Sequence, residues 1–187
     1  MAILSEDRWQ EKLKALIHES NYELAEEICY ERLREDPSDQ ACLIGLGQIA
    51  WEKGDLRDAV IMYRKAIEAS PEKIEPWVLL SGALIEKQEL ILAEDALGQA
   101  LTLNSDHTEA RKLLAYLYTS TDRIAAALEI FESLRKENDD DPAILEGLGN
   151  TYRMLGRRES AVDVYRSWAG LQPQDGNAWW SLANLKN

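Results

Sequence analysis

The sequence predicts an all-α protein made of stacked helix-turn-helix repeats, and three observations lead to this fold class. Alanine recurs at intervals of 34 residues without an insertion or deletion, each interval carries two apolar faces with helical spacing, and a turn residue separates the two faces. Such regular self-similarity indicates repeats that bury their apolar faces against their neighbours. We therefore expect one domain, 1–187, with repeats 6–39, 40–73, 74–107, 108–141 and 142–175 and a partial repeat 176–187.

The second helix of each repeat is predicted from three columns of this period. The alanine column is Ala25, Ala59, Ala93, Ala127 and Ala161. Four residues later stands the column Cys29, Tyr63, Leu97, Phe131 and Tyr165. Three residues further on stands the column Arg32, Ala66, Ala100, Leu134 and Trp168. A spacing of i, i+4 and i+7 places the three columns on one face of a helix, which we expect to be buried.

The first helix of each repeat carries a leucine column followed by a column of small residues. The leucines are Leu46, Leu80, Leu114, Leu148 and Leu182. The small residues are Gly47, Ser81, Ala115, Gly149 and Ala183. Because small residues let two helices approach closely, we expect the helices of a repeat to meet at this column.

Turn and cap residues mark the ends of the helices. The turn column between the two helices is Ser20, Gly54, Gln88, Asp122 and Gly156. Pro37, Pro71 and Pro173 stand after the second helix of their repeats and end it. In the segment DDDP, Asp141 is expected to cap the next helix and Pro142 to take its first position.

These columns resemble the tetratricopeptide repeat (TPR) family, whose W-x2-L-G-x2-Y…A-x3-F…P pattern has the same length. The clearest copy is LIGLGQIAWEKGDLRDAVIMYRKAIEASP, Leu43 to Pro71, and the resemblance covers residues 6 to 187. It implies a right-handed α-α superhelix, the TPR solenoid, with five helix-turn-helix repeats plus one C-terminal helix. It also implies binding of a peptide or a partner helix in a concave groove, rather than catalysis.

Two repeats depart from the family pattern. In the first repeat, Lys12 and Leu13 stand where a leucine and a small residue are expected. The fourth repeat has Arg111 at the aromatic position and Asp139 in place of proline. We therefore expect these repeats to pack less regularly, and the first repeat to fray.

In the family, the second, fifth, ninth, twelfth and thirteenth residues of each first helix line the inner face. Carried over to this chain, these positions predict a peptide- or partner-binding set: Ile44, Gln48, Trp51, Val78, Ile85, Lys112, Tyr116, Asn150, Arg153, Trp180 and Asn184. The same positions include Gln10, Lys14, Ile17, Ala41, Glu75 and Glu146. The middle of the expected groove is apolar and its C-terminal end is polar, which suits an amphipathic helix or an extended peptide with apolar anchors.

The expected groove residues allow two interpretations. The apolar ones either contact a partner or pack on neighbouring repeats of a tightly wound superhelix. The equivalent amides Asn150 and Asn184 either hold a peptide backbone or are solvated. The carboxylate clamp of the family is not expected, because Gln10, Gly45 and Glu75 occupy its positions. Binding of a chaperone C-terminal tail is therefore not supported.

No catalytic, metal or cofactor site is expected. The two GLG segments, Gly45–Gly47 and Gly147–Gly149, share one repeat position, so we interpret them as packing glycines rather than a phosphate loop. The two histidines, His18 and His107, have no cysteine or carboxylate at metal-ligand spacing.

Charge and composition restrict the partners and the location. The formal net charge of −13 repels phosphate groups, so neither nucleic acid nor an anionic membrane is an expected partner. No apolar run approaches the roughly 20 residues of a membrane span, and the first residues lack the features of a signal peptide. Cys29 and Cys42 do not indicate a disulfide framework, and Cys29 is expected to be a buried thiol. We expect a cytoplasmic protein.

The segment AWWSLANLK, Ala178–Lys186, carries two adjacent tryptophans. Trp179 and Leu182 belong to packing columns of the partial repeat, whereas Trp180 falls on the inner face. Because this repeat lacks its second helix, either the natural chain continues or the edge docks on something, such as a second copy through Trp179 and Leu182. The segment also resembles the junction that precedes the sulfotransferase domain in bacterial TPR proteins.

Three functional hypotheses follow. The first is a non-catalytic protein-protein interaction scaffold that binds a peptide or partner helix in its groove. The second is the substrate-recruiting TPR region of a longer sulfotransferase; the chain itself has no phosphosulfate-binding loop. The third is a scaffold that self-assembles through the open C-terminal edge.

Overall fold

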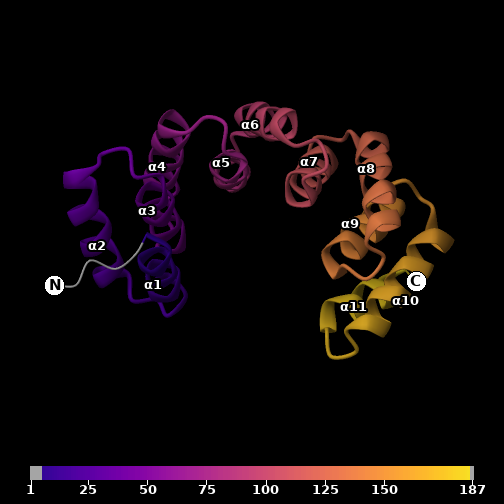
Figure 1. The fold of residues 1–187 in the computed structure, drawn as a ribbon. Helices are drawn as coiled ribbons and strands as arrows, with labels where there is room; N and C mark the ends of the chain where they lie inside the picture. Colours follow the sequence, from indigo (N-terminus) through magenta and orange to yellow (C-terminus); the bar gives the residue numbers. More distant parts are fainter. Residues whose placement is uncertain (1–5, 186–187) are drawn as a thin grey trace. The chain divides into compact units, whose positions relative to one another are not determined.

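The computed structural model describes residues 6–185, and this part of the chain folds into eleven α-helices without a strand. They are α1 (Glu6–His18), α2 (Tyr22–Glu35), α3 (Gln40–Glu52), α4 (Leu56–Ala69), α5 (Ile74–Glu86), α6 (Leu90–Leu103), α7 (Thr108–Ser120), α8 (Ile124–Glu137), α9 (Pro142–Met154), α10 (Arg158–Leu171) and α11 (Gly176–Asn184) (Figure 1). Within the described residues, none of these helices combines the length and apolarity that crossing a membrane requires. The predicted all-α repeat architecture is confirmed.

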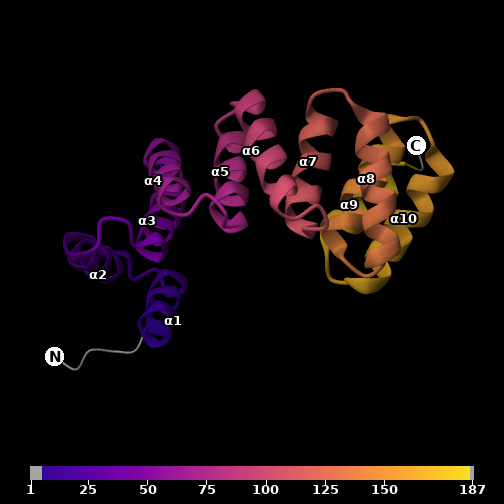
Figure 2. The same cartoon turned by 45° about the horizontal axis from the view of Figure 1, so that its top comes forward.

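The chain forms two compact units, Met1–Ser105 with α1 to α6 and Asp106–Asn187 with α7 to α11. In the first unit each helix contacts the next, and α1 also contacts α3. In the second unit each helix again contacts the next, α7 also contacts α9, and α8, α9 and α10 lie side by side (Figure 2). We call the odd-numbered helices A helices and the even-numbered ones B helices. The expected single domain over 1–187 stays a prediction.

The turn from each A helix to its B helix has the same backbone geometry in all five repeats. The residues of the turn column have positive φ angles between 58° and 79°: Ser20, Gly54, Gln88, Asp122 and Gly156. The N–H of Gly54 donates to the carbonyl of Trp51 at 2.8 Å, and the N–H of Asp55 donates to that of Ala50 at 2.8 Å. This bonding pattern satisfies carbonyls that the end of α3 would otherwise leave unpaired.

The starts of several helices are capped by side chains. Asp39 accepts from the N–H of Cys42, and Asp55 accepts from two N–H groups of α4. Asp141 accepts from two N–H groups of α9, and Pro142 is the first residue of that helix, as predicted. A cap of this kind stabilises a helix by about 1 kcal/mol.

Aromatic rings of the B helices lie on glycines of the A helices. A Cβ atom on Gly47 would stand 2.5 Å from the ring of Tyr63, and one on Gly149 would stand 2.4 Å from the ring of Tyr165. Gly147 faces Phe131 in the same way at 2.3 Å. The two GLG segments therefore lie inside α3 and α9, where they let aromatic rings reach the helix backbone.

The departures in the first and fourth repeats are accommodated by different contacts. Leu13 is buried and packs against Gly45, so α1 approaches α3 closely although its own residue is large. In the fourth repeat, Arg111 on α7 donates to both carboxylate oxygens of Glu137 on α8, at 2.8 and 2.9 Å, and to Ser133 at 2.9 Å. A charge-assisted contact thus takes the place of the aromatic one.

The two cysteines are buried as free thiols, Cys29 on α2 and Cys42 on α3. The neighbouring Cys29 thiol and burial raise the pKa of Cys42 far above its ordinary value. Both thiols therefore belong to the apolar core of the first unit, where Cys29 was expected.

Exchanging residues within the turn column tests the left-handed geometry. We expect Gln88→Gly to raise the free energy of unfolding by about 1 kcal/mol, and the reciprocal Gly54→Gln to lower it by about as much. No atom lies within 4 Å of a Cβ added at Gly54, so the loss reports backbone strain alone. Urea unfolding of the two variants measures both values, and a destabilised Gln88→Gly protein would contradict the prediction.

Candidate functional site

The first unit holds a pocket of about 610 Å³ on the face formed by its A helices. Six predicted inner-face positions line it: Gln10, Lys14 and Ile17 on α1, Ala41 and Ile44 on α3, and Glu75 on α5. The structure therefore brings together residues that are up to two repeats apart in the sequence. We call this cavity the inner pocket.

Close contact between α1 and α3 forms the apolar wall of the inner pocket. A Cβ on Gly45 would stand 3.0 Å from Leu13 and 3.5 Å from Ile17. Both side chains line the pocket together with Ile44, which is only 8% exposed. Ile44 thus contributes more to the core than to a contact surface.

The polar wall of the inner pocket comes from the turn between α2 and α3. The guanidinium of Arg32 bonds to Asp39 at 2.9 Å and lies 3.9 Å from the centre of the Trp9 ring. Asp36 accepts from the N–H and the hydroxyl of Ser38, and these hydrogen bonds lower its pKa. All except Trp9 line the pocket.

This polar wall lies outside the predicted set, which holds only positions on the A helices. Arg32 belongs to a B-helix column, and Asp39 is the residue that caps α3. Ser70 and Lys73, which also line the pocket, occupy the equivalent turn one repeat later. The 34-residue offset between Asp39 and Lys73 was a usable signal.

The charges around the inner pocket are balanced. Lys14, Arg32 and Lys73 contribute positive charge, and Asp36, Asp39 and Glu75 contribute negative charge. No side chain here forms a nucleophile-base pair, and the described residues hold no group of three metal-ligating side chains. The arrangement can bind a ligand that carries both charges and apolar groups.

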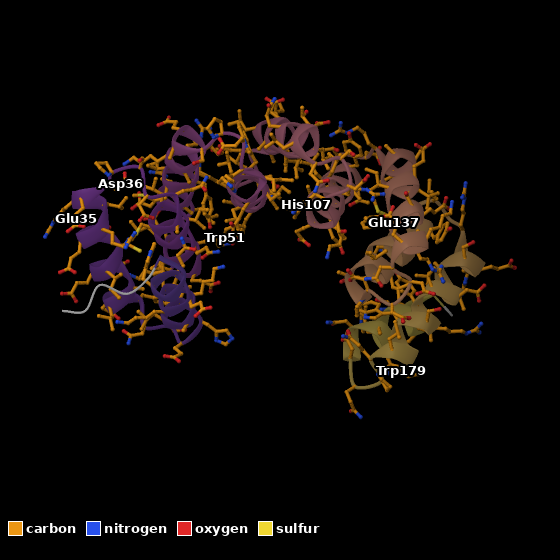
Figure 3. The ribbon with its side chains drawn as sticks, in the orientation of Figure 1. Glu35, Asp36, Trp51, His107, Glu137 and Trp179 are labelled. Atoms are coloured by element: carbon orange, nitrogen blue, oxygen red, sulfur yellow. The ribbon has the colours of Figure 1, made fainter. Side chains whose placement is uncertain are left out.

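The predicted inner-face residue Trp51 is fixed in place (Figure 3). Its indole N–H donates to Glu86 at 2.5 Å, and its ring lies against Gly82, where a Cβ would stand 2.6 Å away. It meets the Tyr63 ring edge-on, with 6.3 Å between the ring centres. Trp51 therefore joins α3 to α5 and exposes only part of its ring.

The other predicted residues of the first unit differ in exposure. Val78 is 8% exposed and belongs to the core, whereas Gln48 and Ile85 are half-buried. Packing thus accounts for most of the apolar surface of Val78, and Gln48 and Ile85 retain surface for a contact.

In the second unit, two predicted inner-face side chains on α7 are held by ion pairs or a hydrogen bond. Lys112 bonds to Glu109 at 2.9 Å and to Asp141 at 3.4 Å. Burial acts to lower the pKa of Lys112, but the two carboxylates raise it above its ordinary value. Tyr116 donates to the carbonyl of Ala143 at 2.7 Å, and burial raises the pKa of its hydroxyl.

On α9, Asn150 accepts a hydrogen bond from the hydroxyl of Tyr165 at 2.7 Å. Its carbonyl oxygen is therefore engaged within the repeat, which leaves the amide N–H₂ group as a donor. At the equivalent place in the first unit, the buried hydroxyl of Tyr63 has no hydrogen-bond partner among the described residues, although Gln48 stands where Asn150 does.

Glu146 on α9 is a half-buried carboxylate at an inner-face position. Burial, and next the charge of Asp175, raise its pKa above the ordinary value of 4.5. Arg153 lies one turn beyond Asn150 and is exposed. The inner face of the second unit therefore presents a carboxylate and a guanidinium.

Both tryptophans of the C-terminal helix α11 are exposed, although Trp179 was expected at a packing position. Trp180 is 70% exposed, and Asn184 is also exposed. Trp179 is 51% exposed, and its indole donates to the carbonyl of Pro173 at 2.9 Å (Figure 3). Leu182 is only 6% exposed and packs in the core of the second unit, so Trp179 offers most of the free surface at this edge. Docking of a second copy through Trp179 and Leu182 stays a prediction.

Comparison with known proteins places these repeats in a family. A tetratricopeptide repeat profile matches residues 84–146 and 123–185, which is more than half of the chain, and a second one matches residues 41–73. The chain belongs to the tetratricopeptide repeat family.

Solved TPR structures share the fold. Pseudomonas aeruginosa PilF is 19% identical, with a TM-score of 0.85 over 96% of this chain and 82% of that one. YrrB, described as a TPR protein with an unusual peptide-binding site, is 23% identical, with a TM-score of 0.74 over 94% of this chain and 89% of that one. These likenesses establish the superhelical TPR fold class, and family and fold together support a general role as a protein-protein interaction scaffold.

One curated TPR relative is a much longer enzyme. Human protein O-mannosyl-transferase TMTC1 is 22% identical over 162 residues, which is 84% of this chain and 18% of that protein. The chain thus spans about a fifth of the length of this relative.

The two equivalent tyrosines of the TPR core give a matched test of the hydrogen bond to Asn150. Tyr165→Phe is expected to lower the free energy of unfolding by about 1 kcal/mol, because it removes the donor to Asn150. Tyr63→Phe is expected to leave it unchanged or raise it, because the Tyr63 hydroxyl is buried without a partner in the described structure. Urea unfolding measures the free energy of unfolding of both variants. An equal decrease in Tyr165→Phe and Tyr63→Phe would contradict this account.

Glu146 should make the stability of the TPR chain depend on pH. Its pKa is higher in the folded than in the unfolded state, so the folded state binds the proton more tightly and stability falls as pH rises above 4.5 through the folded value. We therefore expect Glu146→Gln to raise the free energy of unfolding of the chain at neutral pH, and to change it less well below pH 4.5.

Urea unfolding at a series of pH values measures this difference. The exposed Glu129 on α8 gives the control variant Glu129→Gln, which removes one negative charge from the same unit. A stability gain for Glu146→Gln that is the same at every pH would refute the assignment.

Proposed function

We propose that this chain is a non-catalytic scaffold that holds a peptide or a helix of a partner protein against the inner faces of its A helices. The observation that carries the proposal is the inner pocket, which six predicted inner-face positions line. Its volume of about 610 Å³ lies in the range of pockets that enclose a ligand group.

The chemistry of the inner pocket suits a short peptide segment. Leu13, Ile17 and Ile44 provide an apolar wall for an anchoring side chain. Lys14 and Glu75, both exposed, place opposite charges at the pocket, where they can pair with a charged side chain or a terminus of the partner. A partner with a single apolar anchor and a nearby charge fits this surface.

The inner face of the second unit supports the same function with different groups. Trp180 is the most exposed aromatic side chain of that face and offers a large flat surface for a contact. Arg153, Asn184 and the amide N–H₂ of Asn150 supply donors for backbone or carboxylate oxygens. Each unit thus carries its own candidate contact surface.

A second candidate function is the protein-binding part of a longer enzyme. It is favoured by the alignment of 84% of this chain with a small part of human protein O-mannosyl-transferase TMTC1. In that case the repeats bind a protein substrate, and catalysis belongs to another part of the protein. The resemblance of AWWSLANLK to a sulfotransferase junction adds nothing independent, because Ala178 and Leu182 serve the packing of α11.

Charge reversal at the inner pocket tests the proposal. Peptides are selected from a displayed random library against the whole chain, and their Kd is measured for the parent and for Lys14→Glu and Glu75→Lys. We expect at least one reversal to weaken binding roughly tenfold, or by about 1.4 kcal/mol.

Lys65→Glu and Glu27→Lys are the matched controls, because both residues are exposed and neither lines the inner pocket. Controls that bind like the parent support the assignment. Selected peptides that bind the two pocket variants as tightly as the parent would exclude the inner pocket as their site.

A further inference from the structure

The B helices share a column of large apolar residues, with one exception. Three residues after each repeat alanine stand Ile28, Met62, Ala96, Ile130 and Val164. Ala96 on α6 is the small member of this column. Its repeat therefore lacks several side-chain atoms that the other four supply at the same place.

A pocket of about 300 Å³ opens where those atoms are missing. It lies within the first unit, between α4, α5 and α6, and Ala96 is one of its lining residues. One repeat earlier, the cavity beside Met62 measures only about 120 Å³. Within the first unit, the wider gap is thus the one with alanine in place of methionine. The corresponding gap of the second unit, beside Leu148 and Tyr152, measures about 370 Å³ and is lined mostly by charged side chains. We call the cavity beside Ala96 the outer pocket.

The walls of the outer pocket are apolar and held in place. Its floor consists of Ile67, Leu80 and Leu84, none more than 9% exposed. The indole of Trp77 forms one side, and its N–H donates to the carbonyl of Pro71 at 3.1 Å. The pocket is therefore preformed, and an apolar group can enter it without rearranging the core.

Apolar surface continues outside the pocket on both neighbouring helices. Leu92 on α6 lines the pocket and is 43% exposed, and Ile61 on α4 is 47% exposed. A large side chain of a partner can enter the cavity, and the neighbours of that side chain in the partner find apolar contacts on either side. This arrangement suits the apolar face of a helix better than an isolated small molecule.

The rim of the outer pocket carries more negative than positive charge. Glu68 on α4 and Asp95 on α6 line it and are exposed, and Arg64 is the one basic residue among its lining residues. The helix α6 contains acidic residues but no lysine or arginine. A partner with basic residues near its apolar anchor is therefore electrostatically complementary to this rim.

We propose that the outer pocket is a docking site for an amphipathic helix of a partner protein, which inserts one large aliphatic side chain beside Ala96 and places lysine or arginine next to Glu68 and Asp95. This surface is separate from the inner pocket and shares no lining residue with it. A scaffold with both surfaces can hold two partners at once.

The probe is an alanine-rich helical peptide of about 18 residues with one central leucine and a lysine one turn to each side. Binding to the whole chain is followed by NMR at the indole N–H of Trp77, with that of Trp51 as an internal reference. We expect the Trp77 signal to shift. Peptides with alanine at the centre, or with glutamate in place of lysine, should bind at least about tenfold more weakly.

The alanine-centred peptide keeps both lysines, so it measures non-specific attraction to this acidic chain. Equal binding of the leucine and alanine peptides, or no shift at Trp77, would overturn the proposal.

Filling the pocket gives the decisive variant. Ala96→Met introduces the residue that the preceding repeat has at this position, and it should abolish the Trp77 shift while the chain stays folded. Ala125→Met, at an exposed position on α8, is the matched control and should bind like the parent. Undiminished binding by Ala96→Met would refute the proposal.

Charge reversal keeps the test valid if Ala96→Met does not fold. The double variant Glu68→Lys and Asp95→Lys changes exposed side chains only. It should bind the lysine peptide more weakly than the parent does, and the glutamate peptide more tightly. The opposite result, or no change, would overturn the proposal. Peptides selected for the inner pocket should bind all these variants like the parent, so failure here is distinguishable from failure of the proposed function.

Discussion

The contact on which three of the repeats depend is an aromatic ring placed directly on the backbone of a neighbouring helix. Tyr63 meets Gly47, and Tyr165 meets Gly149, at distances that leave no room for a Cβ atom. Both rings are fully buried, so they contribute a large apolar area to a thin layer of helices. Capped turns and hydrogen-bonded helix ends secure this contact, but they do not replace it.

The same constraint shapes the surfaces that a partner can reach. Where Leu13 packs on Gly45, the helices α1 and α3 come close enough for their side chains to form one continuous apolar wall. Between the B helices of the first unit, the gap beside Met62 is narrow, and the gap is wider where the column holds Ala96. Small residues thus have opposite consequences: a glycine opposite a bulky side chain closes an interface, whereas an alanine without such a partner leaves a hollow.

The sequence period alone predicts much of this architecture, because apolar spacing and turn chemistry are local properties. It gives the order of helices, the left-handed turn residues and the packing role of the GLG segments. The period does not predict contacts in which a large residue in one column packs on a small residue in another. Leu13 is a large residue in a column of small ones, and only its contact with Gly45 explains how the repeat accommodates it. For the inner pocket, the period identified the lining positions on the A helices, but not Arg32 on α2 and Asp39 at the cap of α3, whose side chains pair across the turn between these helices. Likewise, the sequence places an amide near both tyrosines, and only the structure shows that Asn150 accepts the hydroxyl of Tyr165 while the hydroxyl of Tyr63 is unbonded among the described residues.

The joint between α7 and α8 adds an ion pair to a ring contact, in which Tyr116 meets Phe131 edge-on with 5.2 Å between the ring centres. Arg111 connects the two helices through Glu137 and Ser133, and Glu137 is about half exposed (Figure 3). Dissolved ions screen attraction between charges near the surface, whereas they leave the burial of rings almost untouched or strengthen it. Ionic strength therefore acts on this hairpin selectively: a concentrated salt solution loosens one joint of the second unit while the glycine-ring joints hold. Amide hydrogen exchange in α7 and α8 would then respond to salt more than exchange in α10.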